Sequence, residues 1–479
     1  MAGLALVLSY VLENSFICIE RIAFIQSWLL NSTNLQHIHW SVDLKQQQIQ
    51  EVMAGNEDDF EINYDELVKM LVYSAKNLFT ANGSSKQLGM QMKCMELFEK
   101  DYKIQIIDND EGELCTTYPN KMAYFLGYQD EEEDRISRES ARSLPIAPGR
   151  YRQYVERTKT ARVYSRFILP CIFMKNFKVV SRAATISTTA EVFWKNGIRG
   201  ILPQKFSSRM DRDKKYADDS WDLNIVNKKR LVDIELLKQM NIQYIVDMMV
   251  EVKKIKHGVI VSSSEKVDKH QRYKEFDLIC TPFPGCELMM DMDQLFSKEG
   301  LFFDWTEDFV NTELMVPNTV LQYADEIDWT KYKEWDIVLL LQNYMLLMIR
   351  TLREGKSNMM IHCISGWDRT PMWTCLLRLS LWADGETHPN LNADEILYLT
   401  LAYDWFFFGH NLGNRRRRGE FVLHFTYMFL PYIRSEKYSI HGRDSEKLKE
   451  RDEKIMAVYK RYKEIDIATF GIPYKTTSV

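Results

Sequence analysis

The sequence predicts an α/β fold with a central sheet flanked by helices, and two observations carry this prediction. Strand-like and helix-like segments alternate between residues 186 and 435. Within that span, an apolar run ending at His362 leads into a short loop and then into an apolar, helix-like segment that begins at Pro371. Sheets of this kind bind ligands at the carboxyl ends of their strands. The loop after His362 is therefore the expected site.

Four regions are expected along the chain. Residues 1–85 contain helix-like segments of unknown role, and residues 86–185 favour a small β-rich domain. Residues 186–435 hold the alternating strands and helices, and residues 436–479 form a charged helical tail. Strands are expected at 102–107, 113–118, 164–174, 177–180, 244–249, 277–281 and 359–362, and helices at 67–78, 95–100, 335–352, 376–382, 393–408 and 444–465.

Composition excludes several classes of protein. The net charge of -5 and the pI near 6.1 provide no basic field for nucleic acid, so we expect no nucleic-acid partner. The eight cysteines are scattered without a Cys-x2-Cys pair, which indicates a reducing environment and neither a zinc site nor a disulfide framework. No apolar run reaches the ~18 residues of a membrane span, and no secretory signal is expected.

The loop has the order of residues that a cysteine-dependent phosphatase needs. Cys363 is followed six residues later by Arg369, and no other cysteine of the chain has an arginine at that spacing. Such a cysteine attacks phosphorus as a thiolate, the loop N–H groups hold the phosphate, and the arginine binds two phosphate oxygens. The helix that follows would stabilise both negative charges with its N-terminus. The alternative is a buried structural cysteine with Arg369 in an ordinary surface pair.

A general acid must protonate the leaving alkoxide, and there are two candidates. Asp368 lies inside the loop and is favoured, because it would lie close to a substrate oxygen. Its alternative role is to shape the loop by binding backbone N–H groups. Asp328, 35 residues before Cys363, is the alternative acid, and it could equally cap a helix.

The other loop residues are expected to bind substrate: Ile364, Ser365, Gly366, Trp367 and Thr370. Gly366 permits tight curvature, and Trp367 would pack beneath the loop or form a pocket wall. His362 is expected to stabilise the loop as a donor. The basic run from Arg415 to Arg418 would lie on an acidic membrane or form a solvated loop.

The loop resembles that of the myotubularin-related phosphatases, which reads Cys-Ser-Asp-Gly-Trp-Asp-Arg. Five residues match it: Cys363, Gly366, Trp367, Asp368 and Arg369. The loop's first aspartate is Ser365 here, which leaves the contacts to the inositol ring open. Further similar segments, among them 263–269, 284–287 and 379–385, extend the resemblance over about residues 90–430.

This resemblance implies removal of the 3-phosphate from phosphatidylinositol 3-phosphate and phosphatidylinositol 3,5-bisphosphate, with no metal or other cofactor. It implies a protein-tyrosine-phosphatase-like fold preceded by a lipid-binding domain of pleckstrin-homology or GRAM type, which would fit residues 86–185. It also implies a cytoplasmic protein, peripheral on endosomal or autophagic membranes, whose partners are phosphoinositide headgroups. A homo- or hetero-oligomer stays open. Two alternatives remain, namely a protein tyrosine or dual-specificity phosphatase that uses Asp328, and an inactive lipid-binding scaffold.

Overall fold

The computed structural model describes residues 61–81, 83–130, 135, 146–187, 220–251, 253–256, 259–268, 270–290, 292–297, 299–442 and 445–471. Residues 62–479 form one compact unit and residues 1–61 another. The helix-like segments expected before residue 61 lie outside the described residues. The α/β fold belongs to the unit that begins at Ile62.

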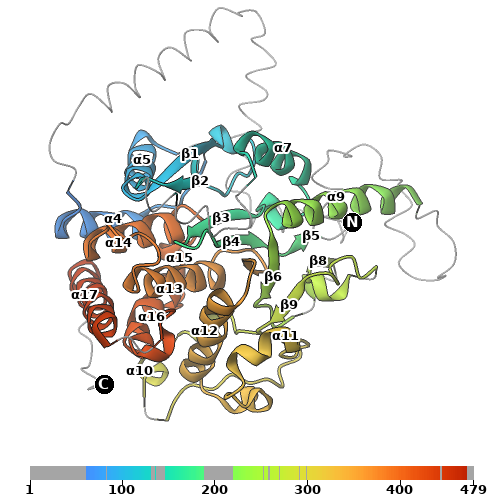
Figure 1. Cartoon of the computed structure of the whole chain (residues 1–479). Coiled ribbons are helices and arrows are strands. Elements are labelled where there is room, and N and C mark those ends of the chain that lie inside the picture. Colours follow the sequence, from blue (N-terminus) through green and yellow to red (C-terminus); the bar gives the residue numbers. More distant parts are fainter. Residues whose placement is uncertain are drawn as a thin grey trace, which may run out of the picture. The chain divides into compact units, whose positions relative to one another are not determined.

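A five-stranded sheet lies at the centre of this unit (Figure 1). Its strand order is β3 (Leu169–Phe173), β4 (Val179–Ala184), β10 (Asn358–Cys363), β6 (Ile242–Asp247) and β9 (Asp277–Cys280). β10 pairs in parallel with β4 and β6, β6 pairs in parallel with β9, and β3 runs antiparallel to β4. The two middle strands, β10 and β6, are almost wholly buried and mostly apolar because both faces of the sheet are covered. The expected strands at 244–249, 277–281 and 359–362 are thereby confirmed.

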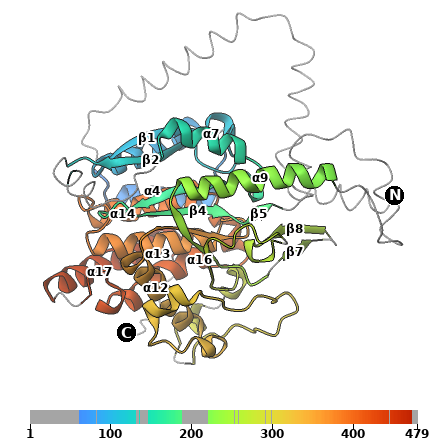
Figure 2. The same ribbon diagram turned by 45° about the vertical axis from the view of Figure 1, so that its right-hand side comes forward.

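Helices cover both faces of the sheet. In two views α12 (Ile337–Glu354), α13 (Arg369–Ala383) and α16 (Val422–Met428) lie below it (Figures 1 and 2). Above it lie α7 (Pro148–Thr158), α9 (Ser220–Gln239) and the hairpin of β1 (Tyr102–Asp108) and β2 (Lys121–Tyr128). All residues of α13 are buried, so the helix that follows the loop after Cys363 runs through the core. The predicted α/β fold with a central sheet is confirmed.

The remaining elements surround this core. They are α4 (Tyr64–Lys76), α5 (Ser85–Glu99), β5 (Ile186–Ser187), β7 (Lys253–Lys256), β8 (Val259–Ser263), α10 (Met292–Leu295), α11 (Asn318–Leu321), α14 (Ala393–Leu399), α15 (Leu412–Arg417) and α17 (Ser445–Phe470), with short 3-10 helices between them. The helix expected over 393–408 continues beyond α14 as a π-helix, Thr400–Phe406. None of the helices in the described part of the chain combines the length and the apolar character that crossing a bilayer requires.

A separate β-rich domain over residues 86–185 is not shown. β3 and β4 belong to that stretch of sequence but pair within the central sheet, next to β10. A hairpin pattern reveals that two strands pair with each other and does not reveal which third strand they join. The compact unit also begins at Ile62 rather than at residue 86, because α4 packs against α15 and α17.

The strand expected over residues 113–118 is wrong. The buried side chain of Asn109 accepts hydrogen bonds from the N–H groups of Leu114 and Cys115 at 2.8 and 3.0 Å. Its amide donates to the carbonyls of Cys115 and Tyr118 at 2.8 and 3.2 Å. The hydrogen bonds to Asn109 occupy backbone N–H and C=O groups that a strand would need for pairing. The strand that pairs with β1 is therefore β2, which follows this turn in the sequence.

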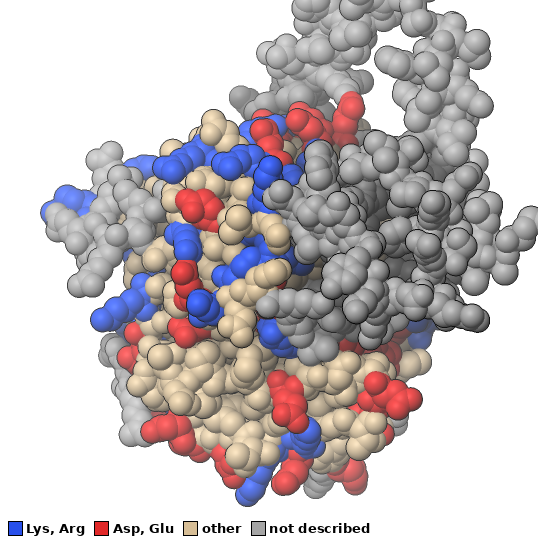
Figure 3. All heavy atoms as spheres, turned by 90° about the vertical axis from the view of Figure 1, so that its right-hand side faces the viewer, with Lys and Arg blue, Asp and Glu red and all other residues tan. Residues whose placement is uncertain are grey.

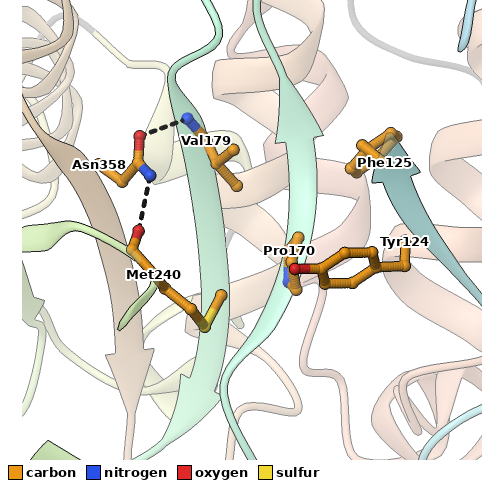
Figure 4. Close-up of a pocket in the computed structure, with 6 residues that line it drawn as sticks. All are labelled: Tyr124, Phe125, Pro170, Val179, Met240 and Asn358. Atoms are coloured by element: carbon orange, nitrogen blue, oxygen red, sulfur yellow. Dashed lines mark hydrogen bonds between the residues drawn. The ribbon is translucent and has the colours of Figure 1, made fainter. Parts of the chain in front are cut away.

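A small cavity of about 20 Å³ lies at the end of β10 opposite Cys363 (Figure 4). Asn358 at the start of β10 joins two neighbouring segments there, accepting from Val179 N at 2.9 Å and donating to Met240 O at 2.7 Å. The cavity has room for about one water molecule. It is therefore a packing feature of the sheet and too small for a substrate.

Candidate active site

The nucleophile predicted from the sequence lies at the carboxyl end of the middle strand. Cys363 ends β10 and is 3% exposed. Its Sγ accepts a hydrogen bond from Gly366 N at 3.2 Å and one from Thr370 Oγ1 at 3.1 Å. Thr370 Oγ1 also accepts from Cys363 N at 3.0 Å. Two donors, one from the backbone and one from a side chain, therefore point at the sulfur.

The turn of the loop is built around Gly366, whose φ of +74° lies in the left-handed region that favours glycine. Its carbonyl accepts a hydrogen bond from Arg166 Nη2 at 3.1 Å. The same nitrogen donates to Phe408 O at 2.8 Å, and Arg166 Nη1 donates to Thr117 O at 3.0 Å. One buried arginine thus joins the catalytic loop to two distant segments of the chain.

Arg369 begins α13 and is held in place by backbone groups. Its Nη1 donates to Met248 O and Phe283 O, both at 2.8 Å. Nε and Nη2 make no hydrogen bond to any residue that the structure describes, so these two nitrogens are free to bind phosphate oxygens. Burial alone lowers the pKa of Arg369, but the nearby Cys363 sulfur and the Glu251 carboxylate outweigh it and raise this pKa. The guanidinium therefore stays charged.

Asp368 is the residue before the helix, and two donors bind its carboxylate. His410 Nδ1 lies 2.9 Å from Oδ1, while Arg415 donates Nε to Oδ1 at 3.2 Å and Nη2 to Oδ2. Burial raises the pKa of Asp368, but the hydrogen bond from His410 and the charge of Arg415 outweigh it, so the pKa is lowered. The site in this state therefore holds a carboxylate rather than a carboxylic acid.

Arg415 is in turn held by a second carboxylate. Its Nη1 donates to Glu420 Oε2 at 2.5 Å, and Arg418 Nε lies 3.0 Å from Glu420 Oε1. Cys286 Sγ donates to Glu420 Oε2 at 3.3 Å and lies 3.8 Å from Asp368 Oδ2. Burial and these carboxylates raise the pKa of Cys286, so it stays a thiol. Loop residue Asp368 is thus part of a charge cluster that reaches from α13 to α15.

Trp367 lies at the side of the loop and stacks on Tyr164, with ring centroids 4.8 Å apart and an interplanar angle of 22°. The backbone of Gly409, at φ +86°, approaches the edge of the indole so closely that a methyl group there would meet Nε1 at 3.3 Å. The indole is half-buried, whereas the Tyr164 ring is 39% exposed. Both roles expected for Trp367, packing beneath the loop and forming a pocket wall, stay predictions.

His362 is wholly buried and pairs with a carboxylate outside the loop. Its Nε2 forms an ion pair with Glu265 Oε2 at 3.0 Å, and Glu265 is also paired with Arg162 at 3.0 Å. Burial lowers the pKa of His362, but Glu265 outweighs this effect and raises it. Arg162 further binds Asp233 through two hydrogen bonds of 2.9 Å. The charged His362 therefore anchors the end of β10, in keeping with the loop-stabilising role expected for it.

The other predicted residues differ in how they are placed. Ile364 is buried and its carbonyl accepts from Thr185 N at 3.2 Å, whereas Ser365 is half-buried. Thr370 is fully buried against the nucleophile. Asp328 caps the 3-10 helix Trp329–Glu334, where it accepts hydrogen bonds from the backbone and side chain of Thr330 at 3.2 and 2.6 Å. The substrate-binding roles of these residues stay predictions.

Charge is unevenly distributed on the side of the molecule where β5 and β8 lie. In the part of Figure 3 that shows described residues, Lys and Arg gather in the upper half. The lower half is largely uncharged, with scattered acidic residues and a few basic ones. Basic and uncharged surface therefore meet on one face.

Comparison with known proteins agrees with this geometry. No protein-family model matches the chain. The chain is 39% identical over 387 residues to a mouse protein named phosphatidylinositol-3,5-bisphosphate 3-phosphatase MTMR14, and 39% identical over 395 residues to the human protein of that name. The chain is a homologue of the myotubularin-related phosphatases. These alignments cover 79% and 80% of this chain but 58% and 60% of the relatives, so the chain spans about three fifths of their length.

A second myotubularin-related protein is similar over a shorter stretch. The mouse protein named phosphatidylinositol-3,5-bisphosphate 3-phosphatase MTMR4 is 26% identical over 134 residues, which is 28% of this chain and 10% of the relative. Three relatives thus carry a name that specifies the same reaction on the same lipid.

Sequence reasoning missed several residues around the loop that carries Cys363. Arg415 belongs to the basic run from Arg415 to Arg418, which was expected to lie on a membrane or in a solvated loop. Arg415 instead lies on α15 and binds Asp368. His410, Cys286 and Arg166 were not singled out. Their distance from Cys363 in sequence left no local pattern, and only the fold brings them to the loop.

Proposed function

We propose that this chain is a phosphoinositide 3-phosphatase that hydrolyses the D3 phosphate of phosphatidylinositol 3-phosphate and phosphatidylinositol 3,5-bisphosphate. The observation that carries the proposal is the loop itself. The sulfur of Cys363 accepts two hydrogen bonds. In the same loop, Nε and Nη2 of Arg369 donate no hydrogen bond to any residue that the structure describes. The names of the myotubularin-related relatives supply the lipid substrate.

In the first step, the thiolate of Cys363 attacks phosphorus and the bond from phosphorus to the inositol oxygen breaks. Arg369 and the loop N–H groups hold the equatorial oxygens as negative charge spreads over them. The leaving alkoxide takes a proton from Asp368. This step leaves a phosphocysteine and a 3-hydroxyl on the lipid.

In the second step, water attacks the phosphocysteine, the sulfur–phosphorus bond breaks, and the Asp368 carboxylate accepts the water's proton. Inorganic phosphate and the thiolate are released. Because Arg415 and His410 favour the carboxylate, Asp368 suits this second step as it stands. For the first step, the substrate phosphate must draw Arg415 away from Asp368, which would raise the pKa of that carboxyl.

We further propose that the enzyme acts at the cytoplasmic surface of endosomal or autophagic membranes. The support is the resemblance to the myotubularin-related phosphatases, together with a substrate that is itself a membrane lipid. An inactive scaffold is disfavoured because Cys363, Asp368 and Arg369 are all present in one loop.

The test is phosphate release by the purified full chain under reducing conditions. The panel contains each phosphatidylinositol mono- and bisphosphate in vesicles and a phosphotyrosine peptide. Wild type should release phosphate from the 3-phosphorylated lipids, and Cys363→Ser should release none. Cys94→Ala, at a buried thiol on α5, is the matched control and should stay active. Release mainly from the peptide would support a tyrosine phosphatase, and no release from any substrate would support the scaffold.

The same panel assigns the acid. Asp368→Asn should lower turnover by about 10²-fold or more. Asp328→Asn should stay near wild type, because that carboxylate is occupied as a cap. The reverse result would move the acid to Asp328.

A further inference from the structure

A continuous series of contacts runs from the catalytic loop to the surface. Trp367 stacks on Tyr164 on one side of the loop. On the other side Asp368 binds Arg415, and Arg415 shares Glu420 with Arg418. The members of this series that reach the surface are therefore joined to the loop by a short chain of contacts.

The series continues to an exposed methionine. The α-carbon of Gly419, next to Arg418, lies so close to Met290 that a methyl group built there would be 3.8 Å from its Cε. The neighbouring residue Met289 accepts a backbone hydrogen bond from Phe421 at 2.9 Å. The segment before Met290 is therefore fixed to the chain that follows α15.

The exposed members of this series share an amphipathic character. Met290 is 54% exposed and Tyr164 is 39% exposed, although both are large and apolar or aromatic. The Arg418 side chain is 62% exposed, and Arg417 is exposed as well. Arg417 forms no ion pair with any residue in the described ranges, so its charge is available to a partner.

We propose that Tyr164, Met290, Arg417 and Arg418 form a rim by which the enzyme sits on the surface of an anionic lipid bilayer. The arginines would bind the headgroups, and the tyrosine and methionine would enter the interface, where amphipathic side chains are favoured. Because the chain as a whole carries a net charge of -5, attraction to such a surface must come from a local patch. The rim is such a patch, and it adjoins the residues that bind Asp368. This inference rests on the proposed function and specifies how that site reaches a lipid embedded in a membrane.

The experiment separates binding to the surface from catalysis. Partition of the full chain onto phosphatidylcholine vesicles with and without phosphatidylserine is measured by flotation. Turnover is measured on a long-chain 3-phosphoinositide in these vesicles and on a water-soluble short-chain form. Arg417→Glu and Met290→Asp are compared with two matched controls, Lys449→Glu on α17 and Leu339→Asp on α12, both at exposed positions.

Wild type should bind the phosphatidylserine vesicles preferentially. Arg417→Glu removes one positive charge and adds one negative charge. It should therefore weaken that binding about 25-fold, since each charge near the surface contributes about fivefold. Both rim variants should lose turnover on vesicles, keep it on the short-chain substrate and differ from the controls.

Three results would contradict the proposed membrane-binding role of the rim. These are equal partition onto both kinds of vesicle, equal losses in rim and control variants, and a loss of turnover on the short-chain substrate in the rim variants. Absence of wild-type turnover on the short-chain substrate would instead overturn the proposed function, while the partition data would still decide whether the rim binds lipid.

Discussion

The guanidinium of Arg415 binds both carboxylate oxygens of Asp368, with Nε 3.2 Å from Oδ1 and Nη2 on Oδ2. These residues are 47 positions apart, on α15 and in the catalytic loop. An arginine in this geometry fixes the orientation of the carboxylate and also holds it ionised. The pairing therefore links the position of α15 to the ionisation of Asp368.

Removal of Arg415 should move the pH profile. The charge of Arg415 lowers the pKa of Asp368, so Arg415→Ala should raise that pKa. If Asp368 acts as the acid in the rate-limiting step, the falling limb of kcat against pH should move to higher pH. If it acts as the base there, the rising limb should move to higher pH instead. A profile with both limbs unmoved would contradict control of Asp368 by Arg415.

The position of α15 should depend on Gly413. This residue lies against the backbone of α4, and a methyl group at Gly413 would collide with Ala75 O. We expect Gly413→Ala to cost about 1–3 kcal/mol of unfolding free energy and to lower kcat by displacing Arg415. The control is Gly89→Ala on α5, where nothing lies within 4 Å of the added methyl group. That variant should be as stable as wild type or more so, with unchanged kcat, as measured by urea unfolding and turnover.

The loop turn should require glycine at position 366. At φ +74° an alanine is strained, and its Cβ would meet Ala183 O at 3.2 Å and Arg166 Nε at 3.3 Å. We expect Gly366→Ala to lower kcat/KM by about 10²-fold, because the N–H that binds the Cys363 sulfur moves. Gly385→Ala carries similar backbone strain at φ +71° with nothing within 4 Å. It should lose stability and keep kcat/KM, and an equal loss of kcat/KM in both variants would argue against a specific role for Gly366.

The end of α17 should make stability depend on pH. Burial raises the pKa of Asp466 from 3.8 to about 6, although the charge of Arg416 opposes the shift. The folded state therefore binds this proton more tightly than the unfolded state does. Its contribution is fully present below pH 3.8 and is lost as the pH rises to about 6.

Replacement of this carboxyl by an amide tests that linkage. Asp466→Asn should raise the unfolding free energy at pH 7 by about 1–3 kcal/mol and flatten its dependence on pH between about 4 and 6. The hydroxyl of Tyr462, 3.2 Å from Oδ1, can still bond the amide. His424 nearby stays neutral, because burial lowers its pKa to about 3. Glu453→Gln, at an exposed position on the same helix, should change neither quantity, and identical curves for Asp466→Asn and wild type would refute the assignment.

Local patterns were sufficient for the strand, loop and helix that carry Cys363 and Arg369. An apolar strand, a Cys-x5-Arg spacing and a proline in the first turn of a helix are all contiguous in sequence, and the structure has β10 and α13 where this pattern predicts them. The sheet position of β3 and β4 could not be predicted in this way. Their hairpin is local, but their pairing beside β10 joins segments almost 180 residues apart.

The sequence alone determined the α/β class and the strand–loop–helix unit that carries Cys363 and Arg369, because those features depend on residues close together in the chain. The roles of these two residues as nucleophile and phosphate-binding arginine stay predictions. The sequence also supplied the resemblance to the myotubularin-related phosphatases. Only the tertiary structure decided that Asp368 is held by Arg415 and His410, that Arg166 ties Gly366 to Phe408, and that Tyr164 covers Trp367. Contacts between distant segments form only when the sheet and its helices pack together. Hydrophobic burial drives that packing, and because it is non-directional, no residue spacing in the sequence predicts which distant side chains will meet.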